Sequence, residues 1–291
     1  MLTLGTFDGV HKGHRSILKK ITQDAEINHY ESVVLTFFPH PRMVLNQDDS
    51  IKLINTIEEK ASLLKELGIQ HLILQEFTKE FANLSAEEFV KEVLVKHLNI
   101  KKIIIGYDHR FGKNRSANIH DLMDFGNKYK FDVEQISAQE IDEVSISSTK
   151  IRKALLEGDI KTANEYLGKP YTISGEVIKG KQLGRTIGFP TANIQLLADY
   201  KLIPKIGAYI VSAKIDDVLV KGMMNIGYNP TVNNNKLSIE VHFIDFDSDL
   251  YGKSIEINVH KYLRSEIKFP SLDALKEQLA NDLSETRAFN L

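Results

Sequence analysis

The chain has 291 residues, of which 42% are hydrophobic and 26% charged, and its net charge is −2. These values are typical of a soluble globular protein with two domains, and a charge so close to balance argues against sustained binding to nucleic acid. The sequence contains no cysteine, which excludes disulfides, thiolate metal sites and thiol nucleophiles. No run approaches the roughly 20 apolar residues of a membrane span, and the start MLTL does not resemble a signal peptide. We therefore expect a cytoplasmic protein with no membrane partner.

The first half alternates short apolar runs with amphipathic segments. The runs at 1–5, 32–38, 71–74 and 102–105 predict buried strands. Apolar residues at three- and four-residue spacing predict helices over 14–28, 57–67, 86–98, 119–130 and 149–167. Ser85 and Glu88 form a capping-box pattern before the third of these helices. This alternation predicts a parallel sheet covered by helices, with ligands at the carboxyl ends of its strands.

A glycine-rich turn with two histidines follows the first strand. The sequence GTFDGVHKGH occupies positions 5–14, where Gly5 and Gly13 let the backbone approach a phosphate closely. His11 and His14 are three residues apart and can share one face of the first helical turn. Imidazoles there can donate hydrogen bonds to an α-phosphate under attack. A metal-binding pair and two unrelated surface histidines are the alternatives; the strand–turn–helix setting favours phosphate.

Two further polar segments accompany this turn. Hydroxyls of Ser147, Ser148 and Thr149 with Arg152 can cap a helix, or can hold the β- and γ-phosphates of a nucleotide. The segment 106–115 follows an apolar strand and is either a solvated loop or a substrate loop. Its mixture of cations with aromatic residues at a strand end favours the substrate loop.

These motifs resemble the HxGH nucleotidyltransferase superfamily, and FPHP at 38–41 with the loop 106–115 narrows the resemblance to FAD synthetase. The resemblance implies a Rossmann-like domain that transfers AMP from ATP to FMN, with release of pyrophosphate. It implies that His11 and His14 bind phosphate during catalysis, and that Asp108, Phe111 and Arg115 contact the flavin. The nucleotide-binding residues that it implies are Gly5, Phe7, Asp8, Gly13, Ser147, Ser148, Thr149 and Arg152.

After GKP at 168–170 the pattern changes to period-two and β-branched runs, at 171–178, 207–215, 218–224, 237–243 and 255–263. They predict an antiparallel barrel or sandwich. An amphipathic helix over 271–287, with Ser271 as its N-cap, ends the sequence. We therefore expect two domains, 1–168 and 169–291.

A second glycine-rich segment precedes PTAN at 190–193. Gly180, Lys181, Gly184 and Arg185 could serve ATP phosphates, although glycines also occur at barrel corners. Thr191 and Asn193 are two residues apart on an extended segment, so their oxygens could jointly bind Mg²⁺ on ATP. Glu240 is a candidate general base on an alternating strand; the alternative is a plain solvent-exposed face.

This half resembles the riboflavin kinase domain along nearly its whole length, through 180–193, 225–231, 240–247, 249–252 and 263–269. The resemblance implies a six-stranded antiparallel barrel with a terminal helix, and phosphorylation of riboflavin by Mg-ATP with Glu240 as base. It implies an ATP site that includes Pro190, Thr191 and Asn193. The flavin-binding residues that it implies are Arg264, Glu266, Asp273 and Leu275.

The whole chain is thus similar to the bifunctional bacterial riboflavin kinase/FAD synthetase family, with an α/β fold in the first domain. ATP, riboflavin and FMN are the implied substrates, and the sequence leaves the oligomeric state open. The competing hypothesis is a nucleotidyltransferase of another substrate, regulated by a barrel that senses flavin without catalysis.

Overall fold

A computed structural model describes residues 1–46, 51–107, 109–137, 146–180, 182–231 and 234–291. The chain divides into two compact units, Met1–Ser148 and Thr149–Leu291. None of the described helices is long and apolar enough to cross a membrane.

The first unit contains a five-stranded parallel sheet in the order β3-β2-β1-β4-β5. Its strands are β1 (Leu2–Leu4), β2 (Val33–Phe38), β3 (His71–Glu76), β4 (Lys102–Gly106) and β5 (Asp132–Ile136). The predicted Rossmann-like architecture is confirmed, and β5 is an additional strand that the sequence pattern did not indicate.

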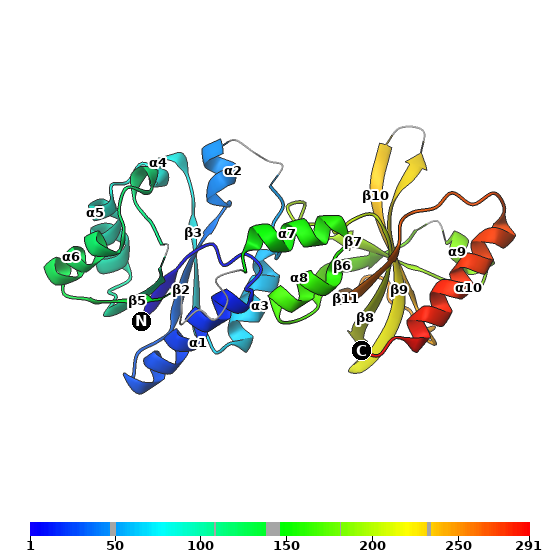
Figure 1. Ribbon diagram of the computed structural model, residues 1–291, viewed down its shortest axis with the longest axis horizontal. Helices are drawn as coiled ribbons and strands as arrows, with labels where there is room; N and C mark the ends of the chain where they lie inside the picture. The colour runs from blue at the N-terminus through cyan, green and yellow to red at the C-terminus, as the bar shows by residue number, and fades with distance from the viewer. Residues whose placement is uncertain (47–50, 108, 138–145, 181, 232–233) are drawn as a thin grey trace. The chain divides into compact units, whose positions relative to one another are not determined.

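Helices cover both faces of this sheet (Figure 1). Helices α1 (Lys12–Ile27) and α3 (Ile57–Glu66) pack on one face, against a cluster that includes Val34 and Ile104. The π-helix η1 (Phe89–His97) and α6 (Ile119–Tyr129) pack on the other face, against Leu35 and Ile103. Neighbouring strand residues therefore point to opposite cores, as expected for strands buried on both sides.

Most of the predicted helices form, with local differences. The predicted helix over 86–98 is a short α5 (Ala86–Glu88) followed by η1, and its Ser85–Glu88 capping box is present. The segment 149–167 is two helices, α7 (Ser148–Glu157) and α8 (Ile160–Leu167). Gly158 has a φ of 82° and interrupts the helical path, and Asp159 caps α8. The short helices α2 (Pro41–Asn46) and α4 (Lys79–Ala82) were not predicted, because each is too short to show a helical period.

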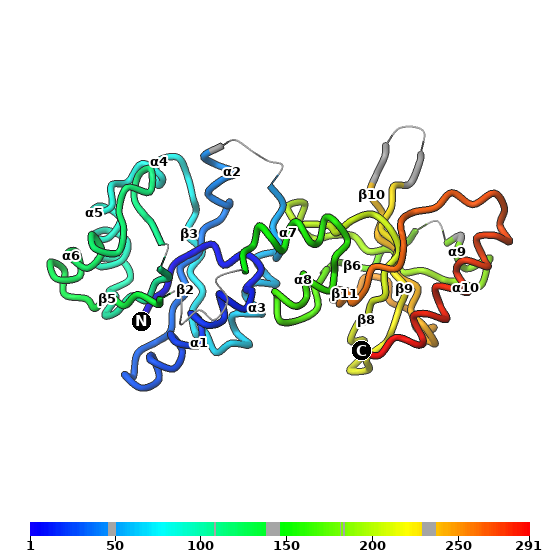
Figure 2. The backbone as a smooth tube through the Cα atoms, in the orientation of Figure 1, coloured from blue at the N-terminus to red at the C-terminus, as the bar shows by residue number. Residues whose placement is uncertain are grey.

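The second unit contains a closed antiparallel barrel in the order β10-β7-β6-β11-β8-β9, so the barrel prediction is confirmed. Figure 2 follows the chain through the barrel to the terminal helix α10 (Leu272–Ala288), which packs against β9. The predicted N-cap Ser271 accepts a hydrogen bond from Ala274 N. The strands are β6 (Tyr171–Ile178), β7 (Ala192–Leu196), β8 (Gly207–Ile215), β9 (Val218–Thr231), β10 (Asn234–Phe243) and β11 (Ser254–Arg264). The short helix α9 (Leu183–Thr186) lies between β6 and β7.

Candidate active sites

The loop between β1 and α1 is a tight, strained turn. Phe7 and Val10 have φ values of 43° and 40°, and Gly9 has 90°. Left-handed backbone is unfavourable for residues with a side chain, most of all for a β-branched one. The turn is nevertheless held rigidly, because Phe7 and Val10 are buried in the core. The order of the sheet puts this loop at the switch point between β1 and β4, where open α/β sheets bind ligands.

Asp8 anchors this loop to the segment that precedes α3. It is 1% exposed, and its carboxylate accepts hydrogen bonds from Ile54 N at 3.0 Å and Asn55 N at 3.3 Å. The carbonyl oxygen of Asp8 accepts a hydrogen bond from Ser148 Oγ at 2.8 Å. Asp8 therefore fixes the conformation of the loop, and the Ser148 side chain is hydrogen-bonded to the same loop.

His11 and His14 stack on each other at the start of α1. Their ring centroids are 3.7 Å apart with an interplanar angle of 18°. His11 is the N-cap of α1, and its Nδ1 accepts the backbone N–H of His14 at 3.4 Å. Burial lowers the pKa of His11 to about 4, although the Asp8 carboxylate opposes this shift. Burial, His11 and Lys60 together lower the pKa of His14 well below its usual value.

Both imidazoles are therefore neutral at physiological pH. His14 Nδ1 is buried and has no hydrogen-bond partner among the described residues. An unsatisfied buried polar atom is costly. The position of the His14 ring beside the first free N–H groups of α1 is typical of a site that binds an anion.

The other predicted residues of this half lie in different settings. Gly5 and Gly13 flank the turn, and Ser147 precedes α7, whose first turns carry Thr149 and Arg152 in the second unit. Asp108 lies outside the described residues. Phe111 is only 7% exposed and packs in the core beside Phe89, whereas Arg115 is exposed.

Glu240 and Thr191 form the centre of the polar site on the barrel. Thr191 Oγ1 donates a hydrogen bond to Glu240 Oε2 at 3.0 Å. Asn193 is the direct neighbour of Glu240 in the pairing of β7 with β10. Both strands are half-buried at these positions. A hydroxyl, an amide and a carboxylate are thus brought together, in the grouping that the resemblance to riboflavin kinase implied.

Gly180 makes room for Asn193. A Cβ atom at Gly180 would lie 2.2 Å from Asn193 Nδ2 and 2.4 Å from its Cγ. Gly184 similarly allows the close approach of the Phe189 carbonyl. Both glycines therefore let other atoms approach the backbone more closely than a side chain would allow. Such close approach is expected whether the segment binds ATP phosphates or forms a barrel corner.

The rest of the segment frames PTAN. His242 Nδ1 donates to the carbonyl of Pro190 at 2.8 Å, and Arg185 lies exposed on α9. Lys181 lies outside the described residues.

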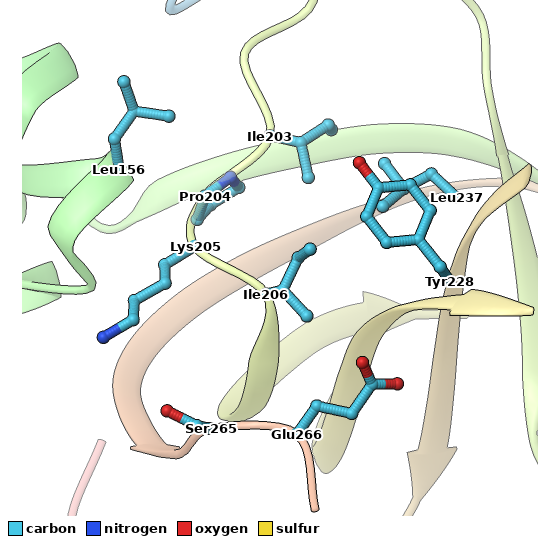
Figure 3. A pocket seen from close by; sticks show the side chains of 9 residues that line it. All are labelled: Leu156, Ile203, Pro204, Lys205, Ile206, Tyr228, Leu237, Ser265 and Glu266. Atoms are coloured by element: carbon cyan, nitrogen blue, oxygen red, sulfur yellow. The ribbon is translucent and has the colours of Figure 1, made fainter. Parts of the chain in front are cut away.

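The second unit also contains a cavity of about 570 Å³, lined by residues of α7, β9, β10 and the segments 203–206 and 265–266 (Figure 3). Glu266 is the one predicted flavin residue that lines it, and its carboxylate lies above Gly227, where a Cβ would come within 2.5 Å of Oε1. The side chain of Tyr228 lies next to Leu237 in the same wall (Figure 3). The lining residues are Leu156, Ile203, Pro204, Lys205, Ile206, Tyr228, Leu237, Ser265 and Glu266.

Arg264 forms a bidentate ion pair with Asp282 of α10. Its Nε lies 3.0 Å and one terminal nitrogen 2.7 Å from Asp282 Oδ2. Asp273 is exposed and Leu275 half-buried near the start of the same helix. The pair therefore fixes the helix on which two other predicted flavin residues lie.

Sequence reasoning missed several buried charged residues, among them Lys60 and Asp282. Lys60 lies on the buried side of α3 with Leu63 and Leu64, and Asp282 lies on the buried side of α10 with Thr286. Lys60 is 2% exposed and Asp282 is 6% exposed. Only the partners brought in by the fold, Thr6 and Arg264, reveal why these charges are tolerated.

A switch-point loop with paired imidazoles, together with a barrel that carries a Thr–Glu–Asn cluster, defines a nucleotidyltransferase joined to a small-molecule kinase. The FAD synthetase family matches residues 1–150, and the riboflavin kinase family matches residues 167–290. The chain belongs to the family of bifunctional riboflavin kinases/FMN adenylyltransferases.

Relatives of that name match along nearly the whole chain. The protein from Listeria monocytogenes is 40% identical, over 99% of this chain and 92% of its own length. The protein from Escherichia coli K12 is 37% identical over the same shares. A crystal structure of a Streptococcus pneumoniae protein, named as a macrolide-efflux protein, is 34% identical with a TM-score of 0.89. It covers 99% of this chain and 94% of its own, so the same two-part fold is shared.

Proposed function

We propose that this chain converts riboflavin to FMN in the barrel unit and FMN to FAD in the first unit, using ATP in both steps. The observation that carries the proposal is that each unit contains its own reactive cluster. His11 stacks on His14 in the first unit, and Thr191 bonds to Glu240 in the second. Because both reactions consume ATP, we also propose a cytoplasmic location.

In the kinase step, Glu240 takes the proton of the riboflavin 5′-hydroxyl. The freed oxygen attacks the γ-phosphorus of ATP, the bond to the β-phosphate oxygen breaks, and ADP leaves. The Thr191 hydroxyl donates to Glu240, which orients the carboxylate and leaves the Thr191 lone pairs available. Such transfers depend mainly on positioning and on neutralising phosphate charge.

Mg²⁺ is the proposed companion of ATP in the barrel. The described residues contain no group of three acidic, histidine or cysteine side chains able to hold a metal alone. Mg²⁺ commonly takes one or two protein oxygens and completes its shell with water and phosphate. Oxygens of Thr191 and Asn193 fit that role, and the ion would neutralise phosphate charge there.

In the adenylyl step, a phosphate oxygen of FMN attacks the α-phosphorus of ATP and pyrophosphate leaves. No proton needs to be removed from the ionised nucleophile, so the site has to orient the phosphates and stabilise charge. Neutral His11 and His14 would donate from their ring N–H groups toward the α-phosphate. Ser147, Ser148, Thr149 and Arg152 are proposed to hold the β- and γ-phosphates.

The flavin contacts and the domain limits are proposals as well. A cavity lined by Glu266 supports a flavin position near Arg264, Asp273 and Leu275. Asp108, Phe111 and Arg115 are proposed for the FMN site of the first unit, and residue 168 as the limit between the catalytic domains.

A time course with riboflavin, ATP and Mg²⁺, repeated from FMN, tests the proposal. FMN should appear before FAD, and Glu240→Gln should slow FMN formation by about 100-fold or more while FAD still forms from FMN. His14→Ala should have the opposite selectivity. Loss of both activities in a folded variant would refute independent sites, and flavin binding without any ATP turnover would favour the sensor hypothesis.

A further inference from the structure

Lys60 is a buried cation directly behind the β1–α1 loop. It lies on α3 and is 2% exposed. Its Nζ donates to the carbonyl oxygen of Thr6 at 2.7 Å and lies 3.4 Å from Thr36 Oγ1. Lysine is seldom fully buried, because removing its charge from water is costly. A lysine in this position therefore requires an explanation.

The contacts of Lys60 converge on the strained part of the loop. Thr6 immediately precedes Phe7, the first left-handed residue of the turn. The Thr6 carbonyl also accepts the Thr36 hydroxyl at 3.2 Å, so two donors fix its direction. Two residues later, Asp8 is held by the backbone amides of the segment before α3. One short stretch of chain thus fixes the loop on both sides of Phe7.

The charge of Lys60 also reaches the imidazoles. It contributes, with burial and His11, to the lowered pKa of His14. Burial lowers the pKa of Lys60 itself, and Asp8 is the acidic group that opposes this. A fixed positive charge beneath a phosphate-binding loop favours an anion above it.

We propose that Lys60 is a positioning residue of the adenylyl transfer: its ammonium group fixes the Thr6 carbonyl and supplies buried positive charge under the loop that carries His11 and His14. This inference rests on the proposed adenylyltransferase function of the first unit. It does not concern the kinase step, which serves as an internal control in the same chain.

The test compares Lys60→Met and Lys60→Arg with the unaltered chain in the conversion of FMN to FAD. Methionine keeps most of the side-chain volume and removes the charge. We expect kcat to fall on the order of 10- to 100-fold, as for a misplaced reacting group, while the KM for FMN stays within about twofold. The rate of riboflavin phosphorylation should not change. Adenylylation by Lys60→Met within about twofold of normal would overturn the proposal.

Arginine distinguishes charge from shape and covers the case in which Lys60→Met does not fold. Lysine with a lowered pKa loses its proton as pH rises, whereas arginine stays charged at all accessible pH values. As the pH rises into the alkaline range, adenylylation by the unaltered chain should therefore decline, and Lys60→Arg should extend the active range to higher pH. Identical alkaline profiles for the two proteins would refute a role for the charge. If the unaltered chain makes no FAD from FMN, the proposed function fails instead.

Discussion

Replacing Asp282 with alanine should destabilise the barrel unit strongly. The side chains of Asp282 and Arg264 are 7% and 19% exposed, and three hydrogen bonds join them. Removing one partner of a buried ion pair costs about 3–5 kcal/mol, because the other charge is left uncompensated. Arg264 keeps some contact with solvent, so we expect a cost at or just below the bottom of that range, about 2–3 kcal/mol. For a unit of roughly 150 residues this corresponds to a fall in Tm of about 6–12 °C.

A neighbouring ion pair provides the control. Lys261 and Glu285 join the same strand and helix at 2.7 Å, but they are 48% and 51% exposed. Exposed pairs contribute about 1 kcal/mol or less, so Glu285→Ala should lower the Tm by no more than about 4 °C. Calorimetry of the full chain would measure both variants, with riboflavin kinase activity after heating to identify the transition of the barrel. A smaller shift for Asp282→Ala than for Glu285→Ala would refute the reasoning.

The remaining predictions concern one glycine and one histidine. Gly180→Ala should push the Asn193 side chain away, because the new Cβ would lie 2.2 Å from its nitrogen, and kinase kcat should fall by about 10-fold or more. A normal kinase rate would contradict a role for Asn193 at the phosphates. His11 has a pKa of about 4 in the folded protein, so only the unfolded chain takes up this proton between pH 6.5 and 4. The free energy of unfolding of the first unit should therefore fall by about 3 kcal/mol as the pH falls through that range. His11→Asn keeps an N-cap but not the titration, and calorimetry from pH 7 to 5 should find its stability less dependent on pH.

The order of strands and helices was largely readable from the sequence, because each buried element has a strong period. The edge strand β5 was missed since its residues, DVEQI, alternate with acidic and amide side chains and lack an apolar run. β7 was missed because it begins inside PTAN, where turn-like and functional residues conceal a strand. In both cases the segment becomes a strand because it forms hydrogen bonds with a neighbouring strand, and the local sequence pattern does not show this pairing.

The candidate sites could be predicted only where the reactive residues lie close together in sequence or belong to a recognisable motif. His11 and His14 share one helical turn, and their stacking follows from that spacing. The contact between Thr191 and Glu240 spans 49 residues and depends on the antiparallel register of β7 and β10. No local pattern encodes such a register, and only the family resemblance brought these two residues together.

The exposure of the aromatic residues in the loop after β4 decides which of them a flavin could contact. Phe111 packs against Phe89 and is 7% exposed, so its ring already has its apolar partners. Tyr107 directly follows β4, at the carboxyl edge of the sheet, and is 45% exposed. A planar ring gains most by stacking on an aromatic surface that is still in contact with water. If a flavin stacks on Tyr107 or Phe111 without rearranging the core, Tyr107 is the side chain available to it, and Phe111 supports the loop from beneath.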